Sequence, residues 1–232
     1  MPRRAIFDQF PTKSSPCVPG KTPGDTVPLM TRQLLTIDAA GNMANPDGSP
    51  WGSWSARWTP STTAPRVLTA SAKPSEDERQ WAAWSPAARA EFLGRCDDAD
   101  ATFRAAGQTL CILPHAADPL SDVPGVLTFL RQRGTSNVRV VLDPALLLTA
   151  SMIANAEDHL ARAILSIGQM PGLEAIIVRN IQPTDDGSFE SVPLEAGILP
   201  AALLLGPAKQ LPPSVPIAVL AADSCSVASL AD

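Results

Sequence analysis

From Arg66 onward, apolar runs alternate with segments of helical pattern. This alternation constrains the fold more than any other feature of the sequence. Five runs have the length and apolar character of buried strands: residues 66–72, 108–116, 138–142, 173–181 and 215–223. Nearly continuous apolar strands joined by helices are typical of parallel strands covered on both faces, because such strands have no polar side for water. The pattern therefore predicts the α/β class.

Caps and glycines mark the helices between these strands. Ser75 before an acidic turn, and Ser85 before Pro86, are N-cap signals. A later helix starts at Asn155 or at the acidic pair Glu157 and Asp158. The segments expected to be helical lie near residues 86–107, 123–133, 157–168 and 199–205, and glycines at 107, 134 and 168 end the first three.

The first 65 residues differ in composition from the rest. They are dense in Pro, Ser, Thr and Gly, and only residues 32–38 have the pattern of a strand. Such a stretch buries too little apolar surface to offset the entropy lost on ordering. We therefore predict two parts: a largely irregular Pro-rich arm over residues 1–65 and an α/β domain over residues 66–232.

Three tryptophans, Trp51, Trp54 and Trp58, lie close together in the predicted arm. Their rings could form an aromatic anchor for a protein partner or a stacking platform for a sugar. The alternative is that they pin the arm to its own domain, since large rings are usually mostly buried.

Charge and hydropathy limit the partners. The formal net charge is −5, whereas nucleic-acid binding needs clustered Lys and Arg. No window approaches the roughly 18 apolar residues of a membrane span, and the N-terminus lacks the apolar core of a signal peptide. We predict a cytoplasmic protein that binds neither nucleic acid nor a membrane.

Cysteine spacing does not favour a zinc site. The chain has two histidines and no Cys-x-x-Cys pair. Buried or idle thiols in a reducing compartment are the expectation. The four cysteines are Cys17, Cys96, Cys111 and Cys225.

Several segments together resemble the xylose-isomerase-like TIM barrels, a family of sugar isomerases and epimerases. The segments are "FLGRCDDADATFRAAGQTLCILPHA", "VRVVLDPALLL", "HLARAILSIG", "AIIVRNI", "DGSFESVPLEAGILPAALL" and "VPIAVL". They are similar to the family's fourth helix through its eighth strand, and the resemblance covers residues 66–223. It implies a TIM barrel in which carboxylates and a histidine hold a divalent metal (Mn, Co, Mg or Zn) at the C-terminal ends of four strands.

Carried over by position, most of that metal site is missing. Asp143 matches the family's sixth-strand aspartate and is the single matching ligand. The resemblance then implies that the family's reaction fails, because a hard divalent ion needs several ligands. No cofactor is expected unless the site is active. The other family positions fall on Leu113, on Val178 or Arg179, and on Leu220 or Ala221.

Three polar residues nevertheless follow strands on the side where such barrels place their sites: His115, Asp143 and Arg179. In an active site, Arg179 would clamp a carboxylate or phosphate, His115 would act as acid or base, and Asp143 would orient it. The alternative is structural: Asp143 caps the turn after it or pairs with Arg179, and His115 hydrogen-bonds to the backbone. Glu195 is a further candidate.

A complete barrel needs eight strands, and only the last five are legible in the sequence. We therefore predict a barrel whose N-terminal part is incomplete or irregular. Its sheet would then have an open edge that a protein partner or a second copy covers.

Three functions remain open. The first is a divergent sugar isomerase/epimerase-like protein that lacks the metal chemistry and acts as a binding or structural subunit. The second is an active isomerase or epimerase on a sugar or sugar acid. The third is an architectural subunit of a larger complex, anchored by the arm.

Overall fold

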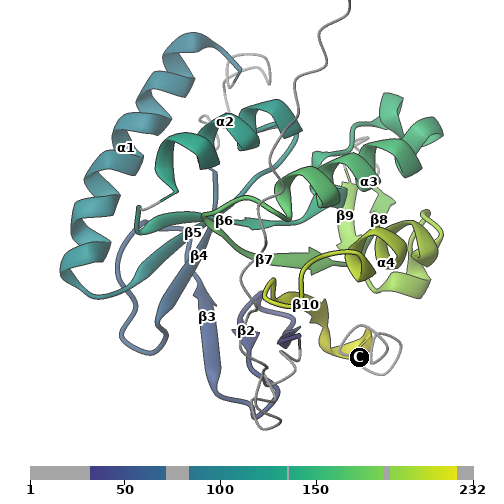
Figure 1. Cartoon of the computed structure of the whole chain (residues 1–232), viewed down its shortest axis with the longest axis horizontal. Coiled ribbons are helices and arrows are strands. Elements are labelled where there is room, and N and C mark those ends of the chain that lie inside the picture. Colours follow the sequence, from purple (N-terminus) through teal and green to yellow (C-terminus); the bar gives the residue numbers. More distant parts are fainter. Residues whose placement is uncertain (1–31, 72–83, 135, 185–188, 224–232) are drawn as a thin grey trace, which may run out of the picture.

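Eight strands close into a barrel in the computed structural model, which describes residues 32–71, 84–134, 136–184 and 189–223 (Figure 1). In order around the barrel they are β1 (Leu34–Ile37), β10 (Ile217–Leu220), β7 (Leu173–Val178), β6 (Val138–Leu142), β5 (Thr109–Leu113), β4 (Arg66–Ala70), β3 (Pro50–Trp54) and β2 (Met43–Ala44). Neighbours are parallel, except that β2 runs antiparallel to both β1 and β3. The predicted α/β, TIM-barrel-like fold is confirmed.

The N-terminal part of the barrel is irregular, as predicted, but it supplies all the strands that closure needs. Residues 34–54 of the predicted arm form β1, β2 and β3, joined by tight turns instead of helices. Gly41 and Gly48 stand in these turns with φ of 82° and 79°, values that glycine adopts without steric cost. Because β1 pairs with β10, the described strands form a closed ring. The prediction of an open edge is therefore wrong, whereas a protein partner or a second copy stays a prediction.

In the described part of the chain, four α-helices cover part of the barrel: α1 (Pro86–Ala105), α2 (Val123–Arg133), α3 (Ala156–Ile167) and α4 (Ala201–Lys209). The predicted cap of α1 is confirmed, since the Ser85 hydroxyl accepts a hydrogen bond from the Ala88 backbone N–H at 3.1 Å. α1 packs on β5 and β6, α2 on β6, and α4 on β7, and α3 lies between α2 and α4 (Figure 1). The helix start signalled at Ser75 lies outside the described residues.

The apolar core has two layers. One fills the space between strands and helices and includes Phe92, Phe103 and Phe129. The other fills the barrel interior and includes Leu35, Met43, Trp51, Leu68, Cys111, Val141, Ala175, Ile177 and Ala218. Successive strand residues alternate between the two layers, as the two-residue period of a strand requires.

Short elements follow the strands at their C-terminal ends. They are η2 (Pro144–Leu147), η3 (Ala150–Asn155), η4 (Leu194–Ala196), η5 (Ala221–Asp223) and the hairpin of β8 (Asn180–Pro183) and β9 (Phe189–Val192). The run over residues 173–181, predicted as one strand, is two strands interrupted at Arg179. Among the described residues, no helix has the length and hydropathy to cross a membrane.

Candidate functional site

Two of the predicted site residues meet at the C-terminal mouth of the barrel. Asp143 follows β6 and Arg179 follows β7. Each lies two residues beyond a side chain of the barrel interior, Val141 and Ile177. The alternation along a strand therefore directs both side chains toward the mouth.

Asp143 is fully buried, and both of its carboxylate oxygens are engaged. Oδ2 accepts a hydrogen bond from Nε of Arg179, and Oδ1 accepts one from the Ala145 backbone N–H at 3.1 Å. The Arg179 side chain is 16% exposed. Asp143 is thus both the N-cap of η2 and the partner of an ion pair, the two structural roles that the sequence left open.

His115 lies in a turn that follows β5. Its Nδ1 accepts a hydrogen bond from the Ala117 backbone N–H at 3.0 Å, and its own backbone N–H donates to the Leu120 carbonyl at 3.2 Å. A hydrogen bond to the backbone is the structural role expected for this residue. The structure therefore joins Asp143 to Arg179 in one ion pair and shows His115 as part of a local turn.

The described residues at the mouth do not fit the metal set that the resemblance implies. Leu113 ends β5, Val178 ends β7 and Leu220 ends β10, and none of these side chains can ligate an ion. The Asp143 carboxylate is already paired with the Arg179 guanidinium. Within the described ranges, no group of three or more His, Cys, Asp or Glu could hold a metal.

Sequence reasoning missed a buried acid, Asp223, at the end of η5. The residue is 3% exposed, and both carboxylate oxygens accept from the Leu194 backbone N–H at 3.1 Å. Burial raises the pKa of Asp223, the hydrogen bond from Leu194 opposes the shift, and the nearby charge of Glu195 adds to it. Glu195 itself is exposed. The missed signal was the carboxylate directly after the last apolar run.

Trp51 lies inside the barrel and not on a binding surface. It is 3% exposed, and the Arg66 guanidinium lies 4.4 Å from its ring centroid. Arg66 and Arg139 both pair with Glu174, at 3.1 and 3.3 Å. These residues form a charged cluster where β4, β6 and β7 begin.

The other two tryptophans of the predicted arm differ from each other. Trp58 packs edge-to-face on Phe92, with 5.9 Å between ring centroids, and the Arg95 guanidinium lies 4.3 Å from its ring. Trp54 is 40% exposed. Trp51 and Trp58 therefore hold the N-terminal strands to their own domain, and Trp54 is the exposed member of this group.

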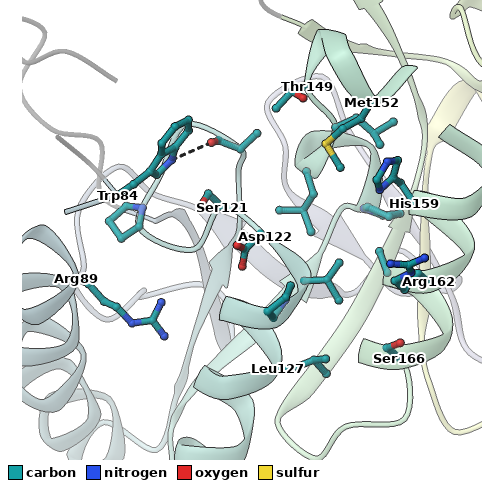
Figure 2. Close-up of a pocket in the computed structure, with 18 residues that line it drawn as sticks. Trp84, Arg89, Ser121, Asp122, Leu127, Thr149, Met152, His159, Arg162 and Ser166 are labelled. Carbon is teal, nitrogen blue, oxygen red and sulfur yellow. Dashed lines mark hydrogen bonds between the residues drawn. The ribbon is translucent and has the colours of Figure 1, made fainter. Parts of the chain in front are cut away.

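A pocket of about 680 Å³ lies beside the mouth, between α2 and α3 (Figure 2). Ala116 and Pro144 line it, but their neighbours His115 and Asp143 do not, and neither does Arg179. Its walls come from helix surfaces and from the turns after β5 and β6. No strand-end pattern marks these residues, so sequence reasoning did not find the pocket.

These features define a class of protein: an eight-stranded, mostly parallel α/β barrel with an ion pair at its C-terminal mouth. No protein-family model and no curated protein matches the chain. Its fold is similar to that of a xylose isomerase-like TIM barrel protein from Mycobacterium smegmatis, solved in complex with magnesium. The sequence identity is 15%, the TM-score is 0.45, and the match covers 67% of this chain and 54% of that one.

Two further solved structures are similar. One is the probable 3-DHS dehydratase AsbF from Bacillus anthracis, with 17% identity, a TM-score of 0.44, and coverage of 68% of this chain and 57% of that chain. The other is a xylose isomerase domain protein from Planctomyces limnophilus, with 15% identity, a TM-score of 0.45, and coverage of 72% and 56%. The chain thus spans little more than half the length of these structures. The likeness concerns the fold, and no activity follows from it.

Proposed function

We propose that the protein is a divergent barrel of the sugar isomerase/epimerase type that does not carry out a metal-dependent reaction and acts as a binding or structural protein. The observation that carries this proposal is the ion pair between Asp143 and Arg179. Asp143 is the single carboxylate at the positions that match the family's metal ligands, and it is buried against the Arg179 guanidinium.

Electrostatics supports the proposal. A divalent cation at Asp143 would lie beside the guanidinium charge, and like charges in a poorly solvated site repel strongly. Moving Arg179 away would leave a largely buried cation without its partner, which is also unfavourable. An active isomerase in which His115 is the acid or base, Asp143 orients it and Arg179 binds the substrate's anionic group would have to break this pair first.

Metal retention tests the proposal. The full-length, untagged protein and its Asp143→Asn variant are incubated with manganese, cobalt, magnesium or zinc, freed of excess ion and analysed for metal. Titration calorimetry with Mg²⁺ covers weak binding, and aldose–ketose interconversion is assayed in parallel. We expect neither a stoichiometric metal nor turnover. One metal per chain that is lost in Asp143→Asn, or sugar isomerisation by the wild type, would disprove the proposal.

A further inference from the structure

The pocket between α2 and α3 has the dimensions and the walls of a small-molecule site. Pockets of roughly 300–1,000 Å³ with mainly apolar walls and a few polar groups are typical of such sites, and this pocket measures about 680 Å³. The apolar wall includes Val123, Leu127, Leu147, Leu148 and Met152. Such a wall favours a ligand with an apolar body, because each contact removes apolar surface from water.

An indole lies at the edge of this wall. Trp84 is 51% exposed, and its Nε1 donates a hydrogen bond to the Ala116 carbonyl at 3.2 Å (Figure 2). That bond fixes the ring while leaving about half of the residue accessible. An exposed aromatic ring held in one orientation is suited to cover part of an apolar ligand.

The charged side chains of the pocket differ in their partners. Arg162 pairs with Asp158 at 2.6 Å on the surface of α3. Asp122 caps α2, where it accepts from the Gly125 backbone N–H at 2.6 Å. Arg89 is half-buried, and within the described part of the chain it takes part in no ion pair. Among the described residues that line the pocket, Arg89 is therefore the guanidinium without an ion-pair partner within 4 Å.

The residues that line the pocket lie on two sides of it. Figure 2 shows Arg89 and Trp84 on one side and Met152, His159 and Arg162 on the other. One available guanidinium next to a mostly apolar wall matches one anionic group attached to an apolar body. A polyol would leave most of its hydroxyls unpaired against this wall, and a multiply charged anion would lack matching cations.

We infer that this pocket binds a small monocarboxylate with an apolar body, whose carboxylate pairs with Arg89 and whose body lies against the apolar wall and the Trp84 indole. This inference rests on the proposed function, because it names the ligand class and the site of a binding protein. The site is separate from the barrel mouth, since Asp143 and Arg179 do not line it.

Calorimetric titration of the full chain tests the inference with three probes: octanoate, 1-octanol and acetate. Octanoate carries both features, octanol lacks the charge, and acetate lacks the apolar body. We expect octanoate to bind once per chain, octanol to bind at least about tenfold more weakly, and acetate not to bind, because a charge-assisted hydrogen bond contributes about that factor.

Two matched variants assign the charge. Arg89→Met keeps an unbranched apolar stem and removes the guanidinium, and we expect it to weaken octanoate about tenfold while leaving octanol unchanged. Arg131→Met is the control, since Arg131 is exposed on α2 and does not line the pocket. Leu127→Trp narrows the pocket and should weaken octanoate and octanol alike.

Three outcomes would overturn the inference: no octanoate binding, equal affinities for octanoate and octanol, or the same effect from Arg89→Met and Arg131→Met. These outcomes are distinct from failure of the proposed function. A protein that retains no metal and binds no octanoate rejects this site alone. One metal per chain that is lost in Asp143→Asn, or sugar isomerisation by the wild type, rejects the proposed function, whatever the octanoate result.

Discussion

Asp143 and Arg179 form an ion pair at the barrel mouth in which the carboxylate is fully buried and the guanidinium is 16% exposed. The two residues come from the ends of adjacent strands, β6 and β7, so the pair joins the turns that follow them. A buried carboxylate is tolerated because its charge is matched and both its oxygens accept hydrogen bonds. The pair thus accounts structurally for the aspartate that the resemblance would assign to a metal.

Removing Asp143 should destabilise the fold strongly. Asp143→Ala leaves the Arg179 cation without a partner and the Ala145 N–H without an acceptor, so we expect a loss of about 3 kcal/mol or more in the free energy of unfolding. Asp143→Asn keeps an acceptor for Ala145 and should lose less. Urea unfolding measures both. Arg162→Ala, which breaks an exposed pair, should change stability by less than about 1 kcal/mol. If Asp143→Ala and Arg162→Ala lowered the free energy of unfolding equally, the buried pair would contribute no more to stability than the exposed one.

The sequence predicted the second half of the barrel well, for physical reasons. β6 spans 138–142 and α2 spans 123–133, as expected. Parallel strands covered on both faces must be apolar throughout, and helix ends need caps such as Ser85. Both requirements leave local marks in the sequence.

The N-terminal strands and the pocket have no comparable signal in the local sequence. β2 has two residues and β3 contains Gly52, so their pairing depends on neighbouring strands and on the turns at Gly41 and Gly48 instead of local propensity. Likewise, Arg89 and Met152 meet at one pocket only after α1 and the turns beyond β6 have packed. The pairing of Asp143 with Arg179 was foreseeable as an alternative, because both follow neighbouring strands.

The two described cysteines should be inert in the folded protein. Burial raises the pKa of Cys96 to about 12 and raises that of Cys111 as well, and the thiolate is the reactive form. At pH 8 the Cys96 thiol therefore stays protonated, because its pKa lies far above that pH. We expect the Cys17→Ser/Cys225→Ser variant to show no fast reaction with a disulfide reagent until guanidinium chloride unfolds it, and then to show two reactive thiols. Fast native reaction would contradict the burial of these thiols.

Asp223 should make stability fall as pH rises above about 4. Its pKa in the folded state is raised above 3.8, chiefly by burial, so the folded state holds the proton after the unfolded state has lost it. Stability attributable to Asp223 is therefore highest below about pH 4 and declines until the pH passes the raised value. Asp223→Asn removes this decline, so the stability of the wild type relative to the variant should decrease between pH 4 and pH 7 in urea titrations. A constant difference across this range would contradict the raised pKa.

Two glycine-to-alanine substitutions should have opposite effects. A Cβ at Gly197 would lie 2.1 Å from Cγ of Asn180, a buried amide that donates to the carbonyls of Leu194 and Leu199 at 2.7 Å. Displacing this amide breaks both bonds, so Gly197→Ala should cost about 2 kcal/mol or more. Gly94 lies within α1, and a Cβ there meets no atom within 4 Å.

Gly94→Ala should therefore raise stability by about 0.5–1 kcal/mol, because alanine loses less backbone entropy on folding. Urea unfolding of the two variants under one set of conditions gives the comparison. If Gly197→Ala also raised stability, the turn over residues 194–199 would have to shift away from Asn180 at little cost. The Asn180 amide would then not be what holds that turn against the start of β8.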